Sequence, residues 1–381
     1  MSIFNNIWSF GGIHVFTFLA VMSLIVFVHE MGHFLVGRWC GVKVDVFSLG
    51  IGPELYGFVD KKGTRWRLAW IPLGGYVKFH GDANGASMPD GQPAMAMPEA
   101  EKAVTLGGQK VWKRAAIVVA GPVANLLLTL VIFSGIIYHY GQAVQQPRIR
   151  TVVAQSPAEA AGFKPGDLVL SIDGRSIASF QDMTRIIIMS ADVPLAFEVE
   201  RDGATVAINA TPRAQMEQTA SGKERIGRIG LGGSRDPKDV KFETYGLVDS
   251  VRLGATETWF WVENTGTTLK QLFTGRVSAD QVSGPLGIGQ ILGDVAKDTP
   301  DRLISIIAIL SLSIGLFNLL PIPLLDGGHL MFYAYEALRG RPMSDKVQEI
   351  GFRVGLAMVA TLMIFVVSND SVKLLRNMGW F

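Results

Sequence analysis

Three stretches of this chain carry no charged side chain over a length that can cross a lipid bilayer. A helix needs roughly 20 apolar residues to span the hydrocarbon core. Asp, Glu, Lys and Arg are missing from Met1–Val28, Ala115–Tyr138 and Leu303–Leu325. A fourth apolar run, Val354–Ser368, is shorter but can extend back to Gly351. We therefore predict membrane-spanning helices at about 13–37, 115–138, 303–328 and 351–368.

The composition supports a membrane protein and excludes several other classes. Of the 381 residues, 49% are hydrophobic types and 18% are charged, whereas soluble domains carry about 25% charged residues. A formal net charge of +2 gives no strongly basic surface, so we expect no nucleic-acid partner. The single cysteine, Cys40, excludes an internal disulfide scaffold.

The ends of the apolar runs predict how the chain is oriented. The first run lacks a basic region before it and ends in His29 and Glu30, so it does not resemble a cleaved signal peptide. Basic residues concentrate in cytosolic loops. Lys and Arg flank the first two runs on one side and fill the loop between the last two. We therefore predict that both termini and the long segment at about 139–301 are extracytoplasmic.

The long segment begins as a β-rich domain. Short strands, separated by Gly, Asp and Pro turns, are predicted at 151–153, 168–172, 195–199 and 205–210. The run Ser156–Gly174 resembles the core motif of bacterial PDZ domains. We place this PDZ-like domain at 145–235 and a connecting segment at 236–301. The membrane core is then formed by two parts, 1–138 and 302–381.

A second β-structure is predicted in the cytosolic loop after the first span. Arg65–Phe79 alternates in polarity and contains Gly74-Gly75, which predicts a hairpin with its turn there. Trp and Tyr side chains suit a membrane interface. A substrate strand opened in a bilayer needs partners for its backbone groups. We therefore predict that the hairpin binds substrate through Gly74, Tyr76 and Val77.

The sequence His29-Glu30-Met31-Gly32-His33 lies at the inner end of the first run. Positions i and i+4 share a helix face, so His29 and His33 can bind one Zn²⁺, and Glu30 can take a proton from a water. In a soluble helix this pattern is usually a solvated face. Inside an apolar helix a charged side chain costs about 2.5–3.5 kcal/mol, and a buried metal would offset that cost.

A catalytic zinc site usually has three protein ligands. Asp326 is the first candidate for the third, because it lies near the inner end of the third run, at a depth compatible with His29. His329 and His80 are the alternatives. Asn125, in the middle of the second run, fits either packing between helices or a role in substrate binding or the active site.

Taken together, these motifs resemble the site-2 protease family of intramembrane zinc metalloproteases, most closely the bacterial RseP-like (regulator of sigma-E protease) branch. The resemblance implies that His29, His33 and Asp326 bind Zn²⁺, that Glu30 is the catalytic base and that Asn318 handles substrate. Relatives carry a membrane-reentrant hairpin, and some carry two PDZ domains where this chain shows one. The resemblance rests on the histidine motif, Gly121–Asn125, the PDZ-like run, Ser283–Ile288 and Asn318–Gly328.

The implied fold is an α-helical polytopic membrane protein with an inserted extracytoplasmic PDZ-like domain and a cytosolic membrane-associated hairpin. The implied function is cleavage of a single-span membrane protein, such as an anti-sigma factor, within the bacterial inner membrane. The cut would follow a first extracytoplasmic cut in regulated intramembrane proteolysis during a stress response, with the PDZ-like domain as a size filter. 

Two other classes remain open. One is a PDZ-bearing membrane adaptor with a structural metal site, which Glu30 argues against because a structural site needs no base. The other is a metal transporter with an intramembrane His and Asp relay. It is disfavoured because the spans contain no continuous polar path.

Overall fold

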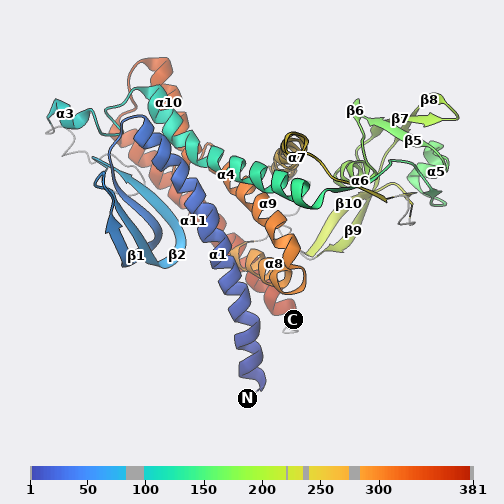
Figure 1. The fold of residues 1–381 in the computed structure, drawn as a ribbon, viewed down its shortest axis with the longest axis horizontal. Helices are drawn as coiled ribbons and strands as arrows, with labels where there is room; N and C mark the ends of the chain where they lie inside the picture. The colour runs from blue at the N-terminus through green and yellow to red at the C-terminus, as the bar shows by residue number, and fades with distance from the viewer. Residues whose placement is uncertain (1, 83–97, 220–221, 235–239, 274–283, 378–381) are drawn as a thin grey trace. The chain divides into compact units, whose positions relative to one another are not determined.

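The computed structural model describes residues 2–82, 98–219, 222–234, 240–273 and 284–377 (Figure 1). The chain forms two compact units. The first comprises Met1–Phe133, Gly254–Thr265 and Val282–Phe381, and the second comprises Ser134–Leu253 and Gly266–Gln281. Each unit is described separately.

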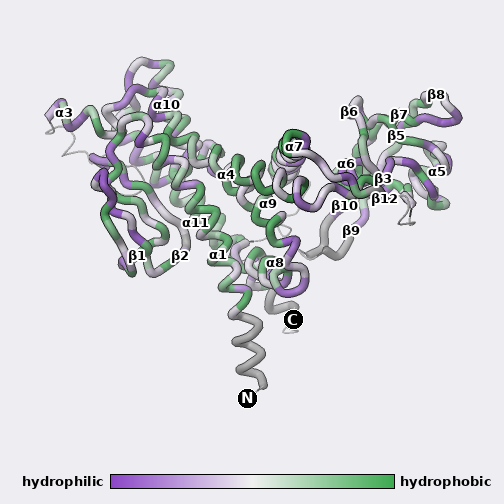
Figure 2. Tube along the Cα trace, in the orientation of Figure 1, coloured by the Kyte–Doolittle hydropathy of each residue, from purple (hydrophilic) through white to green (hydrophobic). Residues whose placement is uncertain are grey.

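Long apolar helices dominate the first unit. Those with spans apolar enough to cross a membrane are α1 (Ser2–Trp39), α4 (Val111–Tyr140), α9 (Pro300–Asn318) and α11 (Asp345–Asn377). Figure 2 shows the predominance of hydrophobic residues along α4 and α9. The prediction of a polytopic membrane protein is confirmed. Shorter helices of this unit are α3 (Glu99–Lys102), α8 (Pro285–Asp298) and α10 (Asp326–Arg339).

The third apolar run is not one continuous helix. α9 ends at Asn318, and α10 begins only at Asp326. Pro321 and Pro323 lie between the two helices, and neither can donate the backbone hydrogen bond that a helix needs. The span predicted at about 303–328 is therefore helical only as far as Asn318, and Asp326 starts a new helix.

The β-structure after α1 differs from the predicted hairpin. Arg65–Phe79 is a single strand, β2, which pairs with a second long strand, β1 (Val44–Val59). The turn lies between these strands, at 60–64, and not at Gly74-Gly75. Gly74 has a φ of +84°, a conformation that glycine adopts without steric cost. The strand bends at this residue but does not reverse.

Both strands bend, so that they form four short strand segments. Val44–Leu49 pairs with Gly75–Phe79 on one side and with Arg65–Leu68 on the other. The second half of β1, residues 54–59, pairs with the outer side of 65–69. Among the described strands, Gly75–Phe79 thus pairs on one side only and forms an edge of this sheet.

Asp60 fastens the turn between β1 and β2 to the end of α1. Its carboxylate accepts hydrogen bonds from the backbone N–H groups of Lys62 and Thr64, from the Trp66 indole and from Arg38 of α1. Although burial opposes the shift, the bonds from Trp66 and Arg38 lower the pKa of Asp60. The carboxylate therefore stays charged at neutral pH.

α8 packs against α1, and its N-terminus is hydrogen-bonded to α11. Val21, Ile25 and Leu292 form a buried cluster between the two helices. At the start of α8, the buried carboxylate of Asp370 from α11 accepts the N–H groups of Gly284 and Gly287, at 3.1 and 2.9 Å. These bonds satisfy amide groups that a helix N-terminus otherwise leaves unpaired.

The second unit contains the predicted β-rich region. A four-stranded antiparallel sheet has the order β6-β5-β7-β8, and α6 (Phe180–Met189) contributes Met183 and Ile187 to its buried core. α7 (Leu247–Phe273) follows this region, in a segment where sequence analysis placed no element. The other elements of the region are α5 (Pro157–Ala161), β3 (Gln142–Gln145), β4 (Thr151–Val152), β5 (Leu168–Ile172), β6 (Arg175–Ser176), β7 (Leu195–Arg201), β8 (Ala204–Ala210), β9 (Arg213–Thr219), β10 (Gly222–Arg228), β11 (Leu231–Gly232) and β12 (Val240–Glu243).

A partly buried ion pair joins β7 to the loop before β5. The Arg201 guanidinium donates to both carboxylate oxygens of Asp167, at 2.7 and 2.8 Å. Although burial opposes the shift, the bonds from Arg201 and from the Lys164 backbone N–H lower the pKa of Asp167. This two-pronged geometry is the strong form of an Arg–carboxylate contact.

Candidate active site

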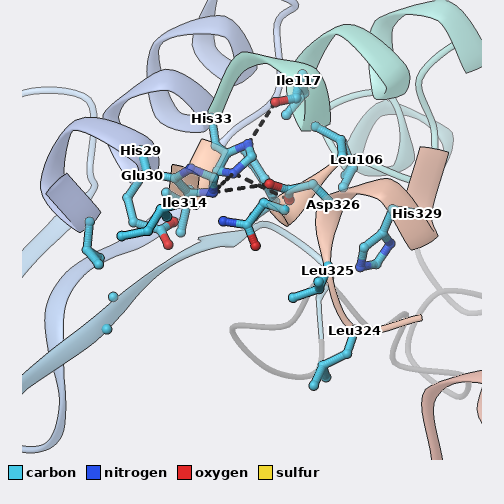
Figure 3. Close-up of a pocket in the computed structure, with 17 residues that line it drawn as sticks. His29, Glu30, His33, Leu106, Ile117, Ile314, Leu324, Leu325, Asp326 and His329 are labelled. Atoms are coloured by element: carbon cyan, nitrogen blue, oxygen red, sulfur yellow. Dashed lines mark hydrogen bonds and ion pairs between the residues drawn. The ribbon is translucent and has the colours of Figure 1, made fainter. Parts of the chain in front are cut away.

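Three predicted ligand side chains converge in the first unit (Figure 3). His29 and His33 lie one turn apart on α1, and their Nε2 atoms are 3.2 Å apart. Asp326, the first residue of α10, places Oδ2 at 3.1 Å from the Nε2 of His29 and Oδ1 at 3.6 Å from that of His33. The structure thus joins two helices that are nearly 300 residues apart in sequence into one group able to hold a metal ion.

The protonation of His33 follows from its hydrogen bond. Its Nδ1 lies 2.8 Å from the backbone carbonyl oxygen of Ile117 on α4. A carbonyl oxygen can only accept a hydrogen bond, so Nδ1 must carry the proton. The lone pair of neutral His33 therefore sits on Nε2, the atom that faces His29 and Asp326. A metal-ligating histidine typically has this arrangement.

The donor set fits zinc. Two imidazole nitrogens and one carboxylate are a known ligand combination of catalytic zinc sites, which leave a position open for water or substrate. The side chains of His29, His33 and Asp326 are only 10%, 12% and 16% exposed. Oδ2 of Asp326 is buried without a well-formed hydrogen bond. A buried carboxylate oxygen in this state is costly unless it is paired, and a bound cation would satisfy it.

A cavity of about 260 Å³ opens beside the three ligands. Glu30 lines it, and the backbone N–H of Val77 in β2 interacts with the Glu30 carboxylate. Gly75 approaches so closely that a Cβ atom there would lie 3.2 Å from the Cγ of Glu30. The edge segment Gly75–Phe79 therefore forms one wall of the cavity, next to the candidate base.

The residues predicted to bind substrate divide into two groups. Gly74, Val77 and Asn318 line the cavity. Tyr76 does not line it, because side chains alternate along a strand and its hydroxyl accepts a hydrogen bond from Arg67 at 3.1 Å. Asn125 does not line it either, since it is fully buried against His29. This geometry gives no support to substrate contact by Tyr76 or Asn125.

The alternative third ligands lie outside the donor group. His329 lines the cavity one turn beyond Asp326, but it is not among the residues whose ligand atoms converge. His80 contacts Asp45 through Nδ1 and Glu101 through Nε2, at 2.9 and 3.1 Å. With both ring nitrogens engaged by other carboxylates, His80 has none left for the site.

Sequence analysis missed two contributors to the site on other elements. Gly121 of α4 faces the imidazoles: a Cβ atom there would lie 2.3 Å from the Nε2 of His33. The run Gly121–Asn125 was part of the family resemblance, but the sequence alone gave Gly121 no physical role. Leu324 also lines the cavity, with a φ of +119° that side chains other than glycine rarely adopt. Nothing in the sequence marks that conformation.

Comparison with known proteins identifies the family. The sequence model of the family described as "Peptidase family M50" matches residues 17–362. The chain belongs to peptidase family M50. This result confirms the predicted resemblance to the site-2 proteases.

Bacterial relatives match nearly the whole chain. A Rhizobium meliloti protein named "Putative zinc metalloprotease" is 47% identical, covering 93% of this chain and 95% of the relative. An Agrobacterium fabrum protein with the same description is 43% identical over 94% of this chain and 95% of the relative. The Caulobacter vibrioides protein "Metalloprotease MmpA" is 41% identical over 92% of this chain and 94% of the relative.

Membership of the M50 family confirms the predicted enzyme class and cofactor. The chain is a zinc metalloprotease, and its cofactor is the Zn²⁺ ion that the donor group His29, His33 and Asp326 fits. Its apolar helices make it a multi-pass membrane protein. The two rival classes, a membrane adaptor and a metal transporter, are not supported by these findings.

Proposed function

We propose that this M50 protease cuts single-span membrane proteins within the bilayer. One observation carries the proposal: both metal-ligating histidines and Glu30 lie on a helix long and apolar enough to span a membrane. Ionisable side chains inside an apolar span are costly and therefore mark functional sites. A peptide bond that reaches them must itself enter the membrane region.

The residues of the site have distinct roles in this reaction. When bound, zinc acts as a Lewis acid that polarises the scissile carbonyl and activates a water molecule. Glu30, on the wall of the same cavity, takes a proton from the attacking water and transfers it to the leaving amine. His29, His33 and Asp326 hold the ion through atoms within 4.8 Å of one another.

The edge segment Gly75–Phe79 would keep the substrate extended. A helical substrate hides its carbonyl groups in backbone hydrogen bonds, and each group freed in a bilayer costs several kcal/mol unless it is paired. Gly75–Phe79 is unpaired on one side among the described strands and borders the cavity. Addition of a substrate strand to this edge would satisfy the freed groups.

The broader setting of the reaction is also part of the proposal. The protease would lie in the bacterial inner membrane, with both termini and the β-rich, PDZ-like domain on the extracytoplasmic side. That domain would act as a size filter, admitting substrates already shortened by a first cut. An anti-sigma factor whose cleavage triggers a stress response is a substrate of this kind. The distribution of Lys and Arg around the spans supports this orientation.

Purified protease in detergent or vesicles tests the proposed reaction. It would be incubated with a single-span substrate in two forms, one with its extracytoplasmic domain and one without, each with and without a zinc chelator. We expect chelator-sensitive cleavage of the shortened form at a bond inside its apolar span. Cleavage outside the span would refute the intramembrane reaction, and equal cleavage of both forms would refute the size filter.

Val77→Pro tests the role of the edge strand. Proline removes the N–H that faces the site and distorts the edge. We expect a large loss of cleavage for a helical substrate and a smaller loss for one with Gly or Pro near the scissile bond, because that substrate is already partly open. Zinc content should stay unchanged. An equal loss for both substrates would mean that Val77 acts through Glu30 and not by pairing with substrate.

A further inference from the structure

Asn125 lies in the middle of α4, fully buried, with its side chain against a zinc ligand. Its Nδ2 atom is 3.3 Å from Nδ1 of His29. Its backbone carbonyl accepts hydrogen bonds from the hydroxyls of Thr129, at 3.0 Å, and of Ser311 on α9, at 3.1 Å. The residue is therefore held in place from its own helix and from a neighbouring one.

The amide oxygen of Asn125 has no hydrogen-bond partner among the described residues. The contact with His29 explains what that oxygen is for. A neutral histidine that ligates a metal through Nε2 carries its proton on Nδ1, so the Nδ1 of His29 is a donor. An amide nitrogen is also a donor, and two donors do not bond to each other.

The amide oxygen and nitrogen occupy nearly equivalent positions, and the hydrogen-bond network decides between them. Rotating the Asn125 amide by half a turn brings Oδ1 to the position that faces His29. No hydrogen bond of Oδ1 is lost, because that atom has no partner among the described residues. The rotated amide accepts the proton of His29 Nδ1 and leaves the Nε2 lone pair directed at the ligand group.

We propose that Asn125 is a positioning residue for the zinc site, whose amide oxygen accepts the Nδ1 proton of His29 and fixes that ring for metal binding. His33 has the same arrangement, since its Nδ1 donates to the Ile117 carbonyl. Ile117, Gly121 and Asn125 follow one another at intervals of four residues, so they share one face of α4. This face supplies a carbonyl acceptor, a gap for the rings and an amide acceptor.

In the metal-free site an amide is less costly to bury here than a carboxylate would be, whereas bound Zn²⁺ would offset the added charge of a carboxylate. The amide supplies the acceptor without adding a second buried charge to a group that already contains Asp326, and an unpaired charge is far costlier to bury than an amide. Outer hydrogen bonds of this kind typically change metal affinity by about 10–100-fold. The expected effect is therefore on zinc affinity first and on cleavage only as a consequence.

Zinc affinity of Asn125 variants tests the proposal, measured by competition with a chromophoric chelator on purified full-length protein. We expect Asn125→Ala to bind zinc about 10–100-fold more weakly. Asn125→Asp should restore the affinity to at least the wild-type level, because a carboxylate is an obligate acceptor. Ser313→Ala is the matched control: it removes a hydroxyl bond of the same kind, from Ser313 to the Ile309 carbonyl oxygen within α9, and should leave zinc affinity unchanged.

Two results would overturn the proposal. One is an Asn125→Ala protein that unfolds at the wild-type temperature without zinc and still binds zinc as tightly as the wild type. The other applies even if that variant does not fold: Asn125→Asp would bind zinc much more weakly than the wild type. The proposal rests on the zinc-protease assignment, but this readout does not need a substrate. Failure of intramembrane cleavage would therefore leave it standing.

Discussion

Gly121 of α4 faces both candidate histidine ligands, so Gly121→Ala is a sharp test of the site. A Cβ atom at this position would lie 2.3 Å from Nε2 of His33 and 2.8 Å from Nε2 of His29. An ordinary van der Waals contact begins at 3.4 Å. The added methyl group thus overlaps with the two nitrogens that bind the metal.

The size of the effect follows from these distances. To reach an ordinary contact, His33 would have to move by about 1.1 Å, which is 3.4 Å minus 2.3 Å. Zinc–nitrogen bonds are about 2.0–2.1 Å long and tolerate deviations of only about 0.2 Å. Movement of α4 away from α1 would separate two closely packed backbones, since Gly32 of α1 lies so near the Ala120 carbonyl oxygen that an added Cβ would be 2.2 Å from it.

We therefore expect Gly121→Ala to lose at least about 100-fold in zinc affinity, the upper end of the effect of removing an outer hydrogen bond. Zinc content by elemental analysis and chelator competition would measure the loss, with thermal unfolding as the check on folding. Gly135→Ala is the matched control on α4, because nothing lies within 4 Å of its added Cβ. It should keep full zinc affinity and gain about 0.5–1 kcal/mol of stability.

A folded Gly121→Ala protein with unchanged zinc affinity would refute the reasoning. It would mean that the imidazoles bind zinc in positions away from α4. The hydrogen bond from His33 to Ile117 and the proposed role of Asn125 would then both have to be abandoned, because they use the same face of α4.

Three further predictions concern other groups. Glu30→Gln should keep its zinc but lose about 10²–10⁴-fold in cleavage rate, since an amide cannot take a proton; a substrate assay with near-normal turnover would exclude Glu30 as the base. Asp326→Ala should bind zinc more weakly because one of three ligands is gone, whereas His329→Ala should not; chelator competition that showed the reverse would move the third ligand to His329. Asp167→Asn should destabilise the β-rich unit by about 1.5–3 kcal/mol at pH 7, the value of a hydrogen bond to a charged group, measured by amide hydrogen exchange. Folding lowers the pKa of Asp167. This stabilisation is therefore fully present above pH about 3.9, the ordinary Asp pKa, and is lost as the pH falls through the folded pKa. A difference in stability between the variant and the wild type that persisted at acid pH would contradict this prediction.

The candidate metal-binding histidines could be predicted because their signal is local. His29 and His33 share a helix face at a spacing of four residues, and Glu30 stands between them in sequence. The place of Asp326 required a comparison of depths along two apolar runs. That comparison gave the right neighbourhood even though α9 ends at Asn318, because the break shortens the path without changing which end of the run is near His29.

The β-structure could be predicted only in part. Gly74-Gly75 has the composition of a turn, but Gly74 bends a continuing strand, and the chain reverses at 60–64, where Gly63 has a φ of +84°. β1 was missed because its glycines and its proline mask the alternation of its side chains. Both partners of a strand must be known before a Gly-Gly pair can be assigned to a turn or to a bend.

The position of the Asp326 carboxylate depends on how closely backbones pack around it. A Cβ atom at Gly327 would lie 2.2 Å from the Leu320 carbonyl oxygen, and one at Gly328 would lie 2.5 Å from that of Ile322. On the other side, Gly355 of α11 approaches the Pro323 carbonyl oxygen too closely for any side chain. Small residues allow such contacts between helices in membranes. The segment between α9 and α10 is thus enclosed by glycines. The backbone strain at a residue such as Leu324 costs about 1–3 kcal/mol, and such a conformation persists only where the surrounding structure determines it. The Leu-Asp-Gly-Gly sequence therefore serves the metal site twice, through a ligand and through the close packing that holds it.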